Sequence, residues 1–289
     1  MIEGLPSFLC AQKTDFDFEV IIAGNTANLL PFPDIPSSRL KNIRYVDIGI
    51  VPPGHARNTA VSEASGEYIA FLDDDCLPCI DWLSALDRCF RTGAAIVGGR
   101  IGFPVKNYFS RADDVGSFFD QMGRISKTNI TTVAALNLAC TRGVWNKVGP
   151  FAEQVRAGED LEWILRARRL GFRIDYDGDA LAWHLGGRAT LKDVLRHAAL
   201  WGTHSIQVRC KFRQELYTPE FFFNPVLLLI LSPIIGLLFS FRIILERRFR
   251  DWFALPIIAL AKTAWAVFAA KSLLSTKTEQ QGNDRVTGS

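Results

Sequence analysis

Short apolar runs alternate with amphipathic stretches over the first two-thirds of this 289-residue chain. The apolar runs predict strands, and they cover residues 18–22, 43–46, 68–72, 95–97, 172–176 and 180–184. Helices are predicted between them, at residues 56–64, 80–90, 142–148, 159–171 and 191–211. Strands separated by helices of this length favour an α/β fold with a mainly parallel sheet flanked by helices. The more polar residues 104–131 are expected to form a mobile loop or lid.

The pattern changes after residue 214. Residues 221–241 contain no charged side chain, and at ~1.5 Å per residue they could cross a hydrocarbon layer of ~30 Å. A buried core helix is the alternative, although a globular core rarely accepts so long an uncharged run. A second apolar stretch, 252–274, is interrupted by Lys262. We therefore expect a domain at 1–214, hydrophobic membrane-associated helices at 215–274 and a disordered polar tail at 275–289.

The sequence leaves open whether the two apolar stretches cross a membrane. If both cross a membrane, the basic residues 242–250 lie opposite the first domain, against the positive-inside tendency. Pro225, Pro233 and Gly236 would instead allow the first stretch to bend and return. The arginines would then lie near anionic headgroups on the cytoplasmic face, which favours a shallow or re-entrant pair.

Charge and cysteine content exclude some classes of function. A net charge of +3 is close to balanced. This argues against a nucleic-acid partner, because proteins that bind nucleic acids normally carry a basic stripe. The six cysteines are scattered and do not form a disulfide framework. Cys76 and Cys79 form one CxxC, which could be a redox pair or half a zinc site; without a second CxxC, two reduced thiols are favoured. Residues 1–12 include Glu3 and lack the basic start of a secretory signal.

Three consecutive aspartates, Asp73, Asp74 and Asp75, follow directly after the apolar run 68–72. Adjacent carboxylates repel each other unless a cation lies among them. Their oxygens are hard ligands suited to Mg²⁺ or Mn²⁺, which commonly share their coordination with substrate phosphates. Because ligands of α/β sheets bind beyond the carboxyl ends of strands, these aspartates are a candidate metal site. A solvated acidic turn is the alternative.

Several stretches in a fixed order resemble the family 2 glycosyltransferases of the GT-A fold, over about residues 10–205. The matching stretches are Gly-His-Ala-Arg-Asn at 54–58, Ala-Ser-Gly-Glu-Tyr-Ile-Ala-Phe-Leu-Asp-Asp-Asp at 64–75, Asn-Leu-Ala-Cys-Thr-Arg at 137–142, Val-Gly-Pro-Phe at 148–151, Gly-Glu-Asp-Leu-Glu at 158–162, Gly-Phe-Arg-Ile at 171–174 and Ala-Trp-His at 182–184. The resemblance implies transfer of a sugar from a nucleotide-sugar donor to an acceptor hydroxyl, with inversion at the anomeric carbon.

The resemblance also implies roles for the acidic residues. Asp73, Asp74 and Asp75 match the DXD-type motif: Asp74 would approach the ribose of the donor, and Asp75, with Asp73, would hold Mn²⁺ or Mg²⁺ at the pyrophosphate. Asp160 falls where the family has its catalytic base, which takes the proton of the acceptor, and Glu159 would orient the site. On their own, Glu159 and Asp160 would be explained equally well as acids favoured in a first helical turn.

Other residues are expected nearby by the same resemblance. His184 stands where some members have a third metal ligand, although a lone histidine is more often structural. Arg57 and Asn58 would lie near the nucleotide, where a guanidinium can pair with phosphate; a helix-surface role for Arg57 is the alternative. Asn137 and Trp183 are weaker candidates for donor or acceptor contacts.

Two departures from the family pattern bear on the donor pocket. The chain lacks the usual first strand, so the sheet is expected to miss a central strand and to expose edges. The strand at 18–22 is followed by Ala23, Gly24 and Asn25 rather than by the usual aspartate. The identity of the nucleobase in the donor is therefore left open. The expected function is a membrane-associated, metal-dependent glycosyltransferase at the cytoplasmic face, with a carbohydrate or lipid-linked acceptor in cell-surface polysaccharide synthesis. The alternatives are an inactive glycosyltransferase-like membrane partner and a nucleotidyltransferase.

Overall fold

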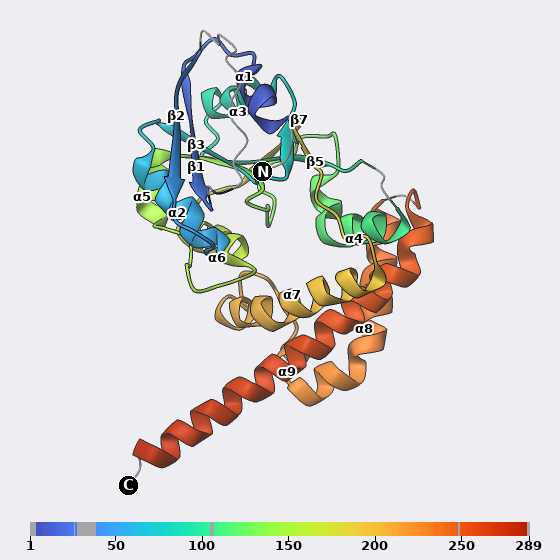
Figure 1. The fold of residues 1–289 in the computed structure, drawn as a ribbon. Helices are drawn as coiled ribbons and strands as arrows, with labels where there is room; N and C mark the ends of the chain where they lie inside the picture. The colour runs from blue at the N-terminus through green and yellow to red at the C-terminus, as the bar shows by residue number, and fades with distance from the viewer. Residues whose placement is uncertain (1–3, 26, 28–38, 105–106, 248, 288–289) are drawn as a thin grey trace. The chain divides into compact units, whose positions relative to one another are not determined.

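The computed structural model describes residues 4–25, 27, 39–104, 107–247 and 249–287. By its internal contacts the chain forms two compact units (Figure 1). Unit 1 comprises residues 1–104 and 120–186, and unit 2 comprises residues 105–119 and 187–289. These units differ from the division expected from the sequence, because the helices at 191–211 and 108–118 pack with the apolar C-terminal helices.

Unit 1 contains two sheets. β1 (Phe18–Gly24) pairs with β2 (Leu40–Asp47) in parallel. The second sheet has the strand order β3-β6-β5-β7-β4. Its strands are β3 (Tyr68–Leu72), β4 (Cys76–Pro78), β5 (Ile96–Gly102), β6 (Asn137–Thr141) and β7 (Asp175–His184).

The expected α/β class is confirmed, but the expectation of a mainly parallel sheet is wrong. β5 and β7 pair in parallel, whereas β3–β6, β5–β6 and β4–β7 are antiparallel. β4 arises because the chain reverses directly after β3 and returns along β7. β3 forms one edge of the five-stranded sheet and, among the described strands, pairs only with β6.

Helices cover both faces of the five-stranded sheet. Ile96 and Leu138 point into a core shared with α5 (Arg142–Val148) and α6 (Glu159–Arg169), whereas the next residues along the strands, Val97 and Ala139, pack under α3 (Trp82–Arg91). This alternation follows from the two-residue period of a strand. The remaining helices of unit 1 are α1 (Leu5–Cys10) and α2 (Pro53–Glu63), and the short η2 (Phe119–Gln121) lies at the boundary between the units.

Unit 2 is helical. It contains α4 (Tyr108–Phe118), α7 (Leu191–Lys211), η3 (Glu220–Phe223), α8 (Pro225–Glu246), η4 (Trp252–Ala254) and α9 (Leu255–Thr287). α8 and α9 pack side by side, and α7 also packs against α9 (Figure 1). Ile206, Leu228 and Ala269 contribute to their common core. Residues Pro225–Glu246 and Trp252–Ser275 are long and apolar enough to cross a membrane by length and composition alone.

Some elements differ from the sequence predictions. The lid expected at 104–131 contains helix α4, whose buried side chains include Ser110, Asp113 and Asp114; these polar residues hide the amphipathic pattern. The two strands predicted at 172–184 form the single strand β7. The tail expected to be disordered continues helix α9 as far as Thr287.

Candidate active site

The three aspartates form a tight turn at the end of β3. The backbone N–H of Cys76 donates to the carbonyl of Asp73 at 3.0 Å, which closes the turn. Strand β4 then pairs with β7, and the N–H of Leu185 donates to the carbonyl of Asp75 at 2.8 Å. Asp74 at the tip is exposed. The turn therefore separates the three carboxylates, which have different neighbours.

Asp75 lies against the end of strand β7. Its Oδ2 is 3.3 Å from Nε2 of His184. Burial raises the pKa of the Asp75 carboxyl, but the hydrogen bond and charge of His184 outweigh this effect and hold it below its usual value. A Cβ at Gly186 would collide with the ends of both side chains, so a larger residue there would require the pair to shift. The structure thus brings together two of the predicted metal ligands.

The third predicted metal ligand, Asp73, is engaged elsewhere. Its Oδ1 accepts a 2.6 Å hydrogen bond from Arg57. Within the described ranges, no group of three or more His, Cys, Asp or Glu side chains is close enough to hold a metal ion. Asp75 and His184 form an oxygen and nitrogen donor pair that suits Mn²⁺. A metal held by these two residues would need further ligands from a substrate or from water.

Arg57 connects the aspartate turn to helix α6. Its Nη2 donates to Asp73, and its Nη1 donates to Oε1 of Glu159 at 2.7 Å. The guanidinium also lies 5.8 Å from the centre of the Phe151 ring. Burial disfavours the charged form of Arg57, but the carboxylates of Asp73 and Glu159 more than compensate and raise its pKa. The predicted acidic stretches, far apart in the sequence, therefore meet around one permanent positive charge.

Local packing sets the position of Arg57 on α2. A Cβ at Gly54 would clash with the carbonyl of Ala152, so α2 begins in close contact with the 151–153 loop. Asn58 accepts from the N–H of Phe151 at 2.8 Å, and donates to the carbonyl of Phe151 and to Glu153 at 2.9 Å each. The amide of Asn58 is thus used by this loop, although the sequence suggested a nucleotide contact. Glu153 had no signal in the sequence.

Glu159 and Asp160 occupy the first turn of α6. Gly158 precedes them with a φ of 93°, a left-handed conformation that favours glycine. Asp160 accepts hydrogen bonds from the N–H of Leu161 at 2.7 Å and of Ala135 at 3.2 Å. Burial raises the pKa of Asp160 to about 6, and the charge of Glu159 acts in the same direction. A carboxyl with this pKa can exchange a proton near neutral pH.

The two weaker sequence candidates have different environments. Asn137 is fully buried; it accepts from the indole N–H of Trp82 and donates to the carbonyls of Arg100 and Ala180, each at 2.9 Å. Its amide therefore links α3, β5 and β7, and the expectation of a substrate contact is wrong. Trp183 is 40% exposed beside Gly102 and remains a candidate.

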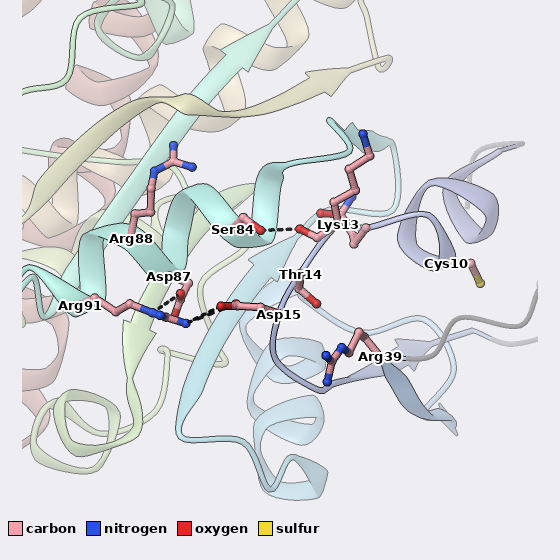
Figure 2. A pocket seen from close by; sticks show the side chains of 10 residues that line it. Cys10, Lys13, Thr14, Asp15, Arg39, Ser84, Asp87, Arg88 and Arg91 are labelled. Atoms are coloured by element: carbon pink, nitrogen blue, oxygen red, sulfur yellow. Dashed lines mark hydrogen bonds and ion pairs between the residues drawn. The ribbon is translucent and has the colours of Figure 1, made fainter.

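A cavity of about 670 Å³ lies elsewhere in unit 1 and contains none of these carboxylates. Figure 2 shows its lining, in which Asp87 and Asp15 hold the guanidinium of Arg91 and Ser84 donates to the backbone of Lys13. Both acids of the lining thus pair with Arg91, whereas Arg39 and Arg88 pair with Asp17 and Asp179, which do not line the cavity. The arrangement of Asp73, Asp75, Arg57 and Asp160 has more of the chemistry of a reaction site.

The cysteines do not form a second reactive centre. All six are free, and Cys76 is buried. Burial and the charges of Asp75 and Asp73 raise the pKa of the Cys76 thiol, which keeps it protonated. The expectation of a thiol packed beside the aspartates holds for Cys76, whose Sγ lies 3.6 Å from Oδ1 of Asp75.

Comparison with known proteins identifies a family for the first half of the chain. Residues 7–144 match the family described as glycosyl transferase family 2. The glycosyltransferase AglE of Haloferax volcanii is 32% identical over 130 residues, which are 45% of this chain and 43% of that protein. The pre-mycofactocin glycosyltransferase of Mycobacterium tuberculosis is 30% identical over 158 residues, which are 52% of this chain and 33% of that protein. The chain thus spans less than half the length of both relatives.

Two solved structures show a partial likeness to this chain. The S. aureus TarS 1–349 structure in complex with UDP has a TM-score of 0.48 at 16% identity, covering 96% of this chain and 88% of that one. The mannosyltransferase PcManGT from Pyrobaculum calidifontis, in complex with GDP-Man and Mn²⁺, has a TM-score of 0.45 at 17% identity with the same coverage.

Proposed function

Because this chain carries a glycosyl transferase family 2 domain, we propose that it is an inverting glycosyltransferase that moves a sugar from a nucleotide donor to an acceptor hydroxyl. The observation that carries the proposal is the pair of hydrogen bonds from Arg57 to Asp73 and Glu159. They bring the proposed donor-binding turn and the proposed catalytic helix into one site.

In this proposal Asp160 is the base. Its carboxylate accepts the proton of the acceptor hydroxyl while the oxygen bonds to the anomeric carbon. The bond from that carbon to the leaving phosphate breaks, and its electron pair departs with the nucleoside diphosphate. Glu159 and Arg57 orient Asp160, and the raised pKa of Asp160 supports its role as an acceptor of protons.

The donor would lie at the aspartate turn. Asp75 and His184 would hold a divalent metal, Mn²⁺ or Mg²⁺, which when bound stabilises negative charge on the leaving diphosphate. Asp74 at the exposed tip would face the ribose. Asp73 and Arg57 would border the phosphates, where the guanidinium favours negative charge.

The acceptor and the location belong to the same proposal. The apolar helices of unit 2 support association with a membrane, and nucleotide sugars are made in the cytoplasm, so we place the enzyme at the cytoplasmic face. A lipid-linked or carbohydrate acceptor, as in cell-surface polysaccharide synthesis, fits such a location. The separate two-stranded sheet favours a second candidate, an inactive domain that serves as a membrane partner.

A screen of nucleotide-sugar donors tests the proposed transferase activity. The full chain with Mn²⁺ and membranes would be incubated with a panel of nucleotide sugars, and release of nucleoside diphosphate would be measured. We expect release with one donor class, dependent on the divalent metal. Absence of release with every donor, for a chain that binds none of them, would favour the inactive partner.

A further inference from the structure

Helix α8 exposes an apolar face. Every exposed residue between positions 226 and 241 is apolar. The opposite side of the helix buries Leu228, Ile235 and Ile243 against its neighbours in unit 2. An exposed apolar surface of this extent marks a contact with a membrane or another protein. It consists of Val226, Leu227, Leu229, Ile230, Pro233, Ile234, Leu237, Leu238, Phe239 and Phe241, which we name the α8 face.

Two other helices of unit 2, α4 and α7, pack along the apolar part of α9. Near its start, Tyr108 of α4 donates to the carbonyl of Phe253 at 2.9 Å. Further on, Lys262 donates to the carbonyl of Gly116 at the end of α4, at 2.7 Å. Near residue 272, Ser272 donates to the carbonyl of Thr203 of α7 at 2.9 Å. α4 and α7 together therefore follow α9 from residue 253 to residue 272.

Residues of α4 and α7 form buried ion pairs. Asp251, at the turn between α8 and α9, accepts from Arg111 of α4 at 2.9 and 2.6 Å and from Arg247 at 3.0 Å. Asp113 of α4 lies 2.9 Å from Arg188 and 3.0 Å from His197 of α7. If α8 and α9 crossed a bilayer, these charges and the exposed side chains of α7 would enter the hydrocarbon as well. Such charges are costly there.

Exposed aromatic residues lie before and after the α8 face in the chain, and exposed arginines follow its carboxyl end. Trp252 is 67% exposed beyond its carboxyl end, and Tyr217 is 90% exposed before its amino end. Arg242 and Arg250 are also exposed. Tryptophan, tyrosine and arginine at the rim of an apolar surface are typical of contact with the headgroups of a bilayer. This rim favours a lipid surface over a second copy of the chain.

We propose that unit 2 is monotopic: the α8 face enters one leaflet, and α4 and α7 stay on the aqueous side. At 22 residues and ~1.5 Å per residue, α8 is about 33 Å long, and it would lie along the membrane plane rather than across it. The inference rests on the membrane association within the proposed function, and it specifies the surface and the depth of that association.

A charged residue placed on the α8 face tests whether this face binds the membrane. Ile230→Glu would be compared with Ile125→Glu, a matched change at an exposed isoleucine of unit 1. With vesicles of phosphatidylethanolamine and phosphatidylglycerol, we expect at least tenfold weaker sedimentation for Ile230→Glu and no change for Ile125→Glu. Equal binding of both variants would overturn the proposal. So would a dimer that is lost in Ile230→Glu without any effect on vesicle binding.

Cysteine labelling tests whether α8 and α9 cross the bilayer or stay in one leaflet. The partly exposed Cys79, Cys89 and Cys210 would be changed to serine, and Asp179→Cys and Arg250→Cys combined in one chain. In sealed proteoliposomes treated with a membrane-impermeant maleimide polymer, a monotopic protein is labelled at both positions or at neither. A spanning pair of helices would give singly labelled chains and overturn the proposal. Nucleoside diphosphate release by the same chains in detergent tests the transferase separately.

Discussion

Arg57 donates a 2.7 Å hydrogen bond to Glu159, a residue 102 positions further along the chain. Both side chains are largely buried, at 14% and 7% exposure. The same guanidinium binds Asp73, so a single cation orients the end of β3 relative to the start of α6.

Asp160→Asn should bind the donor and fail to transfer the sugar. The amide keeps the size of the side chain but cannot accept the proton of the acceptor. We expect turnover to fall by about 10²–10⁴-fold with little change in donor affinity. The measurements are nucleoside diphosphate release and calorimetric titration with the donor. Turnover equal to that of the unmodified chain would remove Asp160 from its role.

Turnover should rise with pH through a midpoint near 6. Asp160 accepts a proton only when ionised, and burial raises its pKa to about 6, so activity is lost below that pH and retained above it. An ordinary aspartate would place the midpoint near 4. Glu159→Gln removes one of the charges that raise this pKa, and the midpoint should therefore move to lower pH in the rate profile. An unchanged midpoint in that variant would contradict the coupling.

Arg57→Lys should lower both stability and turnover. Lysine keeps the charge, but it cannot donate to Asp73 and Glu159 from a planar fork, and Glu159 is left buried without its partner. We expect roughly 3 kcal/mol loss in the free energy of unfolding, measured by urea titration. Arg39→Lys, at an exposed ion pair, is the matched control and should be neutral.

Metal binding should depend on Asp75 and His184. Asp75→Ala and His184→Ala are each expected to weaken Mn²⁺ binding by more than the ~10-fold that loss of an outer partner costs. Asp179→Ala, at a carboxylate that is 80% exposed, should have no effect. Mn²⁺ titration followed by electron paramagnetic resonance measures the affinity directly. Unaltered affinity in both variants would place the metal elsewhere.

Asn58→Ala should reduce stability without changing the KM for the donor. The change leaves the N–H of Phe151 without its 2.8 Å hydrogen bond, and a buried donor without a partner costs about 1–3 kcal/mol. Thermal unfolding and steady-state kinetics distinguish the two effects. A rise in the donor KM with unchanged stability would restore the nucleotide contact expected from the sequence.

Local patterns were sufficient to predict several elements and the identity of the acidic residues. Strand β3 and helices α5 and α7 have the ranges expected, because their apolar spacing reports directly on the face that they bury. Helix α4 escaped prediction because it buries charged Asp113 and Asp114. Strand β4 escaped because three residues become a strand only through their pairing with β7.

The sequence alone determined the candidates for chemistry and membrane contact: the aspartates after a buried strand, the Glu159 and Asp160 pair in a first helical turn, and the apolar C-terminal stretches. Only the tertiary structure decided their partners. Asp75 faces His184, Asp73 is held by Arg57, and the amides of Asn58 and Asn137 form hydrogen bonds within the fold. The reason is physical: apolar periodicity is a property of neighbouring residues, whereas hydrogen bonds and pKa values depend on groups that only folding brings within a few ångströms.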